Sequence, residues 1–450
     1  MTEPLEPPRA RCDPRPILAL LILMTLGASV ATLVVRSADS GAGPAKPRPL
    51  ATDAAAARHE PRLVAIRALL EARSAAILHH DRAGFLSTVD PSETAFYSSQ
   101  ARMFTNLATV TFASWSYTMS RHPASYDGGK LLAYNAPAWA PARFALHYRI
   151  AGFDPVPTRL RQYPTFVERS GRWLLASFSD FSWRGQVSAT DLWDYAPVQV
   201  VNLGNVLALG PSTEQATLLD VATEAQMEIA AVTTVWGPGW ARRVVVQVPA
   251  TQHEMAMLTD DHDDLDQIAA ITSAELSDRR GRPEPVGDRI TVNPFVWPSM
   301  SALGTSVVMA HELTHIATRA DTGVQTPRWL AEGFADYVGF HAVTVIPVPT
   351  FGAELAKQVR AGRLPRALPT DNDFRGGAPG LARSYEEAWL ACRYIAARAG
   401  QPALVRFYRL VGRSRQPTGP AVASALRRVL GLTPAGFVAR WRHYVEKQLG

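Results

Sequence analysis

The sequence predicts an α+β protein of several parts: an N-terminal transmembrane helix, a small α+β domain, and a larger domain with a small mixed sheet and a mainly helical C-terminal half. Three observations predict this. An uncharged apolar run lies near the N-terminus, strand patterns follow helical patterns up to about residue 182, and helical periodicity dominates after residue 300. A chain of 450 residues is also too long for one ordinary hydrophobic core.

The boundaries follow changes in composition and pattern along the chain. We expect a cytoplasmic tail over 1–16, a transmembrane anchor over 17–35, a linker over 36–53, an α+β domain over 54–188, and a second folded domain over 189–450.

The anchor is predicted from the apolar run Ile17–Val35, which is 19 residues without a charge. A helix of that length is just sufficient to cross about 30 Å of hydrocarbon. Arginines precede the run at positions 9, 11 and 15, and basic flanks stay in the cytoplasm, so the rest of the chain is expected outside. The alternative is a signal peptide cleaved near Ser29–Ala31, which would give a secreted protein. We favour the single-pass anchor because the apolar run continues past that position.

Charge and cysteine content exclude some classes of partner and cross-link. Basic residues outnumber acidic ones by 46 to 40, and no Lys/Arg block is present, so we predict no nucleic-acid partner. The two cysteines, Cys12 and Cys392, fall on opposite sides of the predicted membrane segment and cannot pair. Any internal cross-link must therefore come from a metal.

The first domain is predicted to begin with helices and to end with an antiparallel sheet. Helical patterns cover 62–79 and 94–113, and strand patterns cover 115–120, 143–150, 164–169 and 172–179. Ser170-Gly171 indicates a hairpin between the last two strands. With Asp81–Leu86 between the helices, this order resembles the cone-shaped domains of the nuclear transport factor 2-like superfamily. The resemblance implies a spacer or binding domain.

The second domain shows a mixed pattern before it becomes helical. A helix is predicted over 212–232, strands over 240–248, 268–275 and 288–292, a further helix from about 251, and mainly helices from 300 to the end.

A metal-binding motif lies in this helical half, at His311-Glu312-Leu313-Thr314-His315. Residues four apart lie above one another on a helix, so both imidazoles can reach one Zn²⁺ at about 2.0–2.1 Å. Glu312 lies on the adjoining side, where it can accept a proton from water. The competing interpretation is two histidines held on a helix by ordinary packing.

A third ligand is predicted from the segment that follows. Trp329–Tyr337 reads W-L-A-E-G-F-A-D-Y, and a helix that begins near Pro327 would bring Glu332 against the two histidines. Asp336, one turn later, can accept the free ring N–H of a liganding histidine.

Together the two segments resemble the gluzincins, the clan of thermolysin and the aminopeptidase N family. The resemblance implies His311, His315 and Glu332 as zinc ligands and Glu312 as general base. Tyr385, in the segment Ser384–Ala388, matches a tyrosine that stabilises the oxyanion in aminopeptidase N-type enzymes. The strand that ends at Asn293 resembles their substrate-binding edge strand, so Asn293 is a candidate substrate contact. The aminopeptidase signature G-x-M-E-N is absent from the sequence before His311, which leaves internal and terminal cleavage both open.

The resemblance implies a peptidase that holds one Zn²⁺ per chain and acts on a peptide or protein. The N-terminal apolar run and its basic flank predict that this peptidase is anchored in the membrane and faces the outside of the cell. The alternative function is a non-catalytic surface module in which the zinc is structural and the 54–188 domain binds a partner. Cys392, two turns from Tyr385, is interpreted as a small buried hydrophobe.

Overall fold

The computed structural model describes residues 53–120, 124–126, 129–260, 265–266, 268–279, 282–341, 343 and 346–450. The predicted tail, the membrane segment 17–35 and the linker up to residue 52 lie outside these residues and stay predictions. Within the described ranges, none of the helices combines the length and the apolar character needed to cross a bilayer.

The first domain has the predicted order of helices followed by antiparallel strands. Its elements are α2 (Asp53–Leu78), α3 (Arg82–Leu86), α4 (Thr94–Asn106), β1 (Phe112–Met119), β2 (Ser125–Tyr126), α5 (Gly129–Leu132), β3 (Ala138–Pro141), β4 (Phe144–Ile150), β5 (Thr158–Arg161), β6 (Thr165–Arg169) and β7 (Arg172–Ser177). In the described part of the chain the strands form two sheets, β1-β4-β5 and β2-β3-β6-β7. Its likeness to the nuclear transport factor 2-like superfamily stays a prediction.

Local signals explain where the prediction was accurate and where it was not. Ser170 and Gly171 both have positive φ, as a tight hairpin turn between β6 and β7 requires. The second helix was predicted to reach residue 113 but ends at Asn106, because β1 already begins at Phe112. Strands β3 and β5 were not predicted, since each has only 4 residues and is too short to show an alternation of apolar and polar residues.

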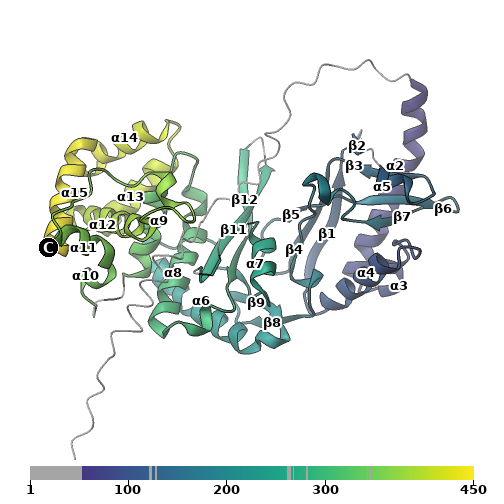
Figure 1. Cartoon of the computed structure of the whole chain (residues 1–450), viewed down its shortest axis with the longest axis horizontal. Coiled ribbons are helices and arrows are strands. Elements are labelled where there is room, and N and C mark those ends of the chain that lie inside the picture. The colour runs from purple at the N-terminus through teal and green to yellow at the C-terminus, as the bar shows by residue number, and fades with distance from the viewer. Residues whose placement is uncertain are drawn as a thin grey trace, which may run out of the picture.

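The second domain opens with a mixed sheet and continues with helices (Figure 1). Its elements are β8 (Val198–Asn202), β9 (Val206–Pro211), α6 (Gln215–Trp236), β10 (Val244–Gln247), α7 (Gln252–Thr259), β11 (Ala270–Arg279), β12 (Arg282–Val292), α8 (Ala302–Thr318), α9 (Arg328–Gly339), α10 (Val348–Phe351), α11 (Ala353–Arg360), α12 (Leu381–Ala399), α13 (Gln401–Gly412), α14 (Thr418–Leu430) and α15 (Pro434–Leu449). The described strands are ordered β11-β12-β10-β9-β8, and β10 runs parallel to both of its neighbours.

The prediction that the strand ending at Asn293 forms the sheet edge was wrong. That strand is β12, which pairs with β10 on one side and with β11 on the other. Strand β11 folds back antiparallel onto β12 and becomes the edge. The edge strand next to the candidate site is therefore the one that contains Thr272.

Both faces of this sheet are buried, each by a different part of the chain. Along β9, Val206 and Ala208 belong to the core formed with α6 and α8, whereas Leu207 and Leu209 belong to the core formed with the first domain. A strand buried on both faces reads as a continuous apolar run, as this one does. The first domain thus covers one face of the sheet and shares a core with it, and it lies on that side of the sheet in Figure 1.

A buried polar network ties the two domains together beside this shared core. Arg289 of β12 donates two hydrogen bonds to Asp154 of the first domain, at 2.8 and 2.9 Å, and both residues are buried. Nearby, Asp191 accepts hydrogen bonds from Tyr148 at 2.6 Å and from Gln247 at 2.9 Å. Buried charges need partners of this kind, so these contacts fix the position of the two domains relative to each other.

We predict that Arg289→Met destabilises the whole chain. The change leaves the Asp154 carboxylate buried without its partner, which costs about 3–5 kcal/mol in such pairs. Chemical denaturation of the purified protein measures the loss. Arg398→Met, at an exposed position on α12, is the control and should change the free energy of unfolding by less than about 0.5 kcal/mol. Equal stability of the two variants would contradict the interdomain role of Arg289.

Candidate metal centre

Helix α8 carries the two histidines and is buried along nearly its whole length. Its N-terminus is capped by Ser301, whose hydroxyl accepts a hydrogen bond from the Gly304 N–H. The helix packs between α6 and α9 and also contacts β11 and β12, so apolar residues occur all around it. His311 and His315 are 6% and 5% exposed, which marks them as buried polar residues that need partners.

Helix α9 brings the third residue to the same place. It begins at Arg328, directly after Pro327, close to the predicted start, and it buries Glu332 to 2% exposure. A Cβ atom at Gly333 would overlap the carbonyl oxygen of Ala388 on α12. Glycine at this position therefore allows α12 to pack directly against α9.

Three ligand-type atoms converge where α8 and α9 meet. The Nε2 atoms of His311 and His315 lie 3.0 Å apart, and Glu332 Oε2 lies 3.4 Å from the first and 3.6 Å from the second. These three residues form the group in the described chain that could hold a metal ion. In a tetrahedral zinc site with bonds of about 2.0–2.1 Å, the ligand atoms stand roughly 3.3–3.4 Å apart. The observed spacings are close to that geometry.

Asp336 orients one of the two imidazoles. Its Oδ1 lies 2.8 Å from His311 Nδ1, one helical turn beyond Glu332 on α9. A hydrogen bond from Nδ1–H to this carboxylate places the lone pair of a neutral ring on Nε2, the atom that faces the other two ligands.

The charges at the site suit a cation. Burial alone raises the pKa of Glu332, but the neighbouring His315 and His311 outweigh it and bring that pKa to about 2. Burial alone lowers the pKa of His311, but the hydrogen bond to Asp336 and the nearby Glu332 carboxylate raise it well above its usual value. The site thus concentrates negative charge that attracts either protons or a metal.

A further observation supports a zinc ion at this site. Glu332 Oε2 and Glu312 Oε1 are buried side-chain oxygens without a hydrogen-bond partner in the described structure. Such orphaned atoms are costly, and a bound ion or water is a common partner for them. Two imidazoles and a carboxylate are also the donors that a catalytic zinc takes.

Glu312 is held by a residue that the sequence did not reveal. Thr272 of the edge strand β11 donates its hydroxyl hydrogen to Glu312 Oε2, at 2.6 Å. Both residues are fully buried, and the same hydroxyl lies 3.2 Å from the Glu312 carbonyl oxygen. A lone threonine in a strand carries no motif, and its proximity arises only when the edge strand packs on α8.

Tyr385 lies on the α12 face that packs against α9. Its ring contacts Phe374 edge-on, with centroids 5.1 Å apart, and it is 5% exposed. Burial and then the charges of Glu332 and Asp336 raise the pKa of Tyr385 well above its usual value. The phenol therefore keeps its proton near neutral pH and can act as a hydrogen-bond donor.

Two other predicted positions are fully buried. Burial raises the pKa of the Cys392 thiol well above its usual range, which suits an inert hydrophobe. Asn293 is also inaccessible: its side-chain oxygen accepts from the Phe295 and Val296 N–H groups, and its amide donates to the Leu265 carbonyl. These bonds close the turn after β12, so the structure does not bring Asn293 to the surface for a substrate contact.

Comparison with solved structures finds weak likenesses to an M1 zinc metallopeptidase. A Glu-to-Ala variant of the enzyme from Deinococcus radiodurans matches with a TM-score of 0.32 and 15% identity over 75% of this chain and 71% of that chain. The same variant bound to a Tyr-Ser-Ala substrate matches with a TM-score of 0.31 and 14% identity, over 75% and 70%. A two-domain form bound to L-arginine gives 0.33 and 14%, over 75% and 71%.

No family model matches the chain, and no curated protein matches its sequence. With structural likenesses this weak, the assignment of the site depends on its own geometry.

We predict that Gly333→Ala destabilises the protein, because the added methyl group would force α9 and α12 apart. Overpacking of this kind costs about 1–3 kcal/mol. Gly419→Ala on α14 is the matched control, since a Cβ there meets nothing within 4 Å, and it should leave stability unchanged or raise it by up to about 1 kcal/mol. Thermal unfolding distinguishes the two, and a Gly333→Ala protein as stable as the control would show that the helices can separate freely.

Proposed function

We propose that this chain is a zinc-dependent peptidase whose centre lies between α8, α9 and α12. The observation that carries the proposal is the convergence of His311 Nε2, His315 Nε2 and Glu332 Oε2, all within 4.8 Å of one another. Three protein ligands of this type are typical of catalytic zinc sites, which keep one position for water or substrate.

In this proposal each nearby residue has a separate task. His311, His315 and Glu332 hold the ion, and Asp336 fixes the ring of His311 through its Nδ1–H. A zinc ion held there would polarise the scissile carbonyl and increase the acidity of an attacking water. Glu312 accepts the proton of that water and passes it to the leaving amine.

Thr272 and Tyr385 complete the reacting groups. The Thr272 hydroxyl holds one carboxylate oxygen of Glu312 at 2.6 Å, which leaves Oε1 available for the proton. Tyr385 is protonated at neutral pH and donates a hydrogen bond to the negative charge that develops on the carbonyl oxygen. Both residues thereby favour the transition state over the ground state.

The location of the enzyme rests on the sequence alone. We propose attachment to the cell membrane through residues 17–35, with the N-terminus in the cytoplasm and the folded domains outside, and a peptide or protein as the substrate.

We predict that Glu312→Gln retains the zinc but loses hydrolysis. Glutamine has nearly the same shape but cannot accept the proton, so the rate on casein or a peptide library should fall at least about 10²-fold. Zinc content stays at the wild-type level, and Glu446→Gln, at an exposed position on α15, keeps full activity.

Undiminished hydrolysis by the Glu312→Gln protein would exclude Glu312 as the base. Wild-type protein that holds zinc but cleaves nothing, with or without a chelator, would favour the non-catalytic surface module instead.

We predict that His315→Ala loses both metal and stability, because the binding free energy of such an ion contributes to folding. Elemental analysis should give much less than one zinc per chain, and the thermal midpoint in the presence of zinc should fall. His443→Ala removes an exposed histidine from α15 and serves as the control. A full zinc complement in the His315→Ala protein would remove His315 from the ligand set.

A further inference from the structure

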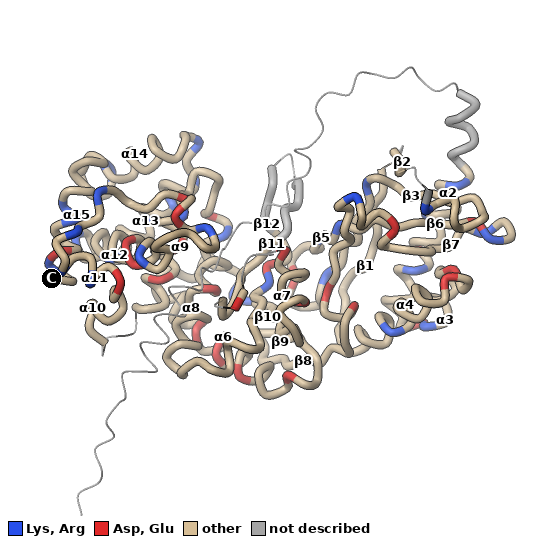
Figure 2. The backbone as a smooth tube through the Cα atoms, viewed as in Figure 1, with Lys and Arg blue, Asp and Glu red and all other residues tan. Residues whose placement is uncertain are grey.

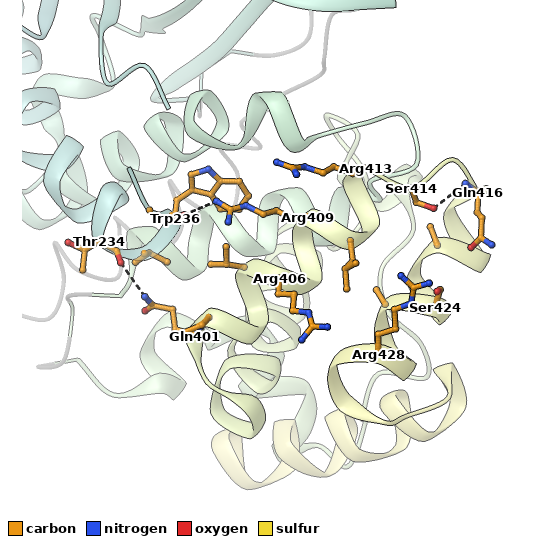
Figure 3. A pocket seen from close by; sticks show the side chains of 17 residues that line it. Thr234, Trp236, Gln401, Arg406, Arg409, Arg413, Ser414, Gln416, Ser424 and Arg428 are labelled. Carbon is orange, nitrogen blue, oxygen red and sulfur yellow. Dashed lines mark hydrogen bonds between the residues drawn. The ribbon is translucent and has the colours of Figure 1, made fainter. Parts of the chain in front are cut away.

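A second cavity lies away from the metal centre and is rich in arginine. It has a volume of about 690 Å³ and lies between the C-terminal end of α6 and the helices α13 and α14 (Figure 3). The described residues that line it include none from α8, α9, α12 or β11, the elements that build the metal centre. Along the coloured part of the backbone in Figure 2, acidic and basic residues are interspersed.

Four guanidinium groups surround this cavity. They belong to Arg406, Arg409 and Arg413 of the α13 segment and to Arg428 of α14, and no carboxylate is found among the described lining residues. Arg409 and Arg413 both pair with Asp321, which lies behind the wall, just after α8. Asp321 thus balances the charge of two of the four arginines.

The four arginines differ in what holds them. Arg409 stacks over the Trp236 ring, with 4.4 Å to the centroid, and donates to the Trp236 carbonyl at 3.0 Å. In the part of the chain that the structure describes, Arg406 and Arg428 have no ion-pair partner. Figure 3 shows their side chains on facing helices, turned toward the same space. Both side chains are exposed to solvent, so an anion can reach them directly and pair with both.

Part of the remaining wall is apolar, and the rest carries the uncharged polar residues Thr234, Gln401, Ser414, Gln416 and Ser424. Val235, Val405, Leu410, Ala421 and Ala425 line the apolar part together with the ring of Trp236. A cavity of this volume accommodates a small organic molecule rather than a lone ion. Guanidinium groups in turn match the geometry of phosphate oxygens and bind them in bidentate fashion.

We propose that this cavity, defined by Arg406, Arg409, Arg413, Arg428 and Trp236, binds a phosphate monoester with an apolar body. The phosphate lies between Arg406 and Arg428, and the apolar part packs on the aliphatic wall. The same chemistry occurs in a free phosphorylated metabolite and in the headgroup of an anionic lipid. The site is independent of the proposed zinc chemistry.

Calorimetric titration of the full chain with phenyl phosphate tests the site without reference to hydrolysis. Wild-type protein should bind with a saturable heat, and the double variant Arg406→Gln/Arg428→Gln should bind at least about tenfold more weakly, because hydrogen bonds between charged groups are lost. The matched control is Arg415→Gln/Arg427→Gln. It removes the same net charge from exposed neighbours that do not line the cavity, and it should bind as wild type does.

Two results would overturn the proposal: no saturable heat with phenyl phosphate, or an equal loss of affinity in both double variants. Binding to vesicles of phosphatidylcholine, with and without phosphatidate, shows whether the natural ligand is a lipid headgroup or a free solute. Phosphatidate-dependent binding that is lost in the Arg406→Gln/Arg428→Gln protein alone assigns the headgroup. Phenyl phosphate binding without such vesicle binding assigns a free solute.

Discussion

The burial of three ionisable side chains at one point is the constraint on which the second domain depends. His311, His315 and Glu332 lie almost out of reach of water, where unpaired polar groups are expensive. Their mutual distances of 3.0–3.6 Å are favourable only if protons or a cation neutralise the carboxylate. The packing of α8, α9 and α12 must therefore hold the groups together against their preference for solvent.

The sheet contributes to the same site through its edge. Strand β11 supplies the Thr272 hydroxyl to Glu312, and the sheet keeps its place because both of its faces are covered. On one face the cover is α6 and α8, and on the other it is the first domain. Arg289 and Asp154 then prevent the two domains from sliding over one another. The first domain is thus part of the scaffold of the site.

The sequence predicted those features that depend on spacing within one helix or between two adjacent ones. His311, His315 and Glu332 were found because a period of four and a following helix imply convergence, and the structure brings these atoms together. Edge and interior strands could not be told apart, since β11 and β12 have similar patterns and only their pairing order decides. Thr272 and Arg289 were missed for a related reason. Each makes its contact with a residue far away in the sequence, and such a contact produces no repeating pattern of residue types that could be recognised locally.

Gly333 has no side chain, yet its small size determines how close the groups of the proposed site on α9 and α12 can be. Any side chain there would displace α12, and with it the phenol of Tyr385, from the carboxylate one residue earlier on α9. A search for other proteins with this arrangement should therefore demand a glycine directly after the glutamate, alongside the two histidines. Under the proposed function, sequences that keep the histidines but carry a bulkier residue at that place would be expected to have retained the ion and lost the oxyanion donor.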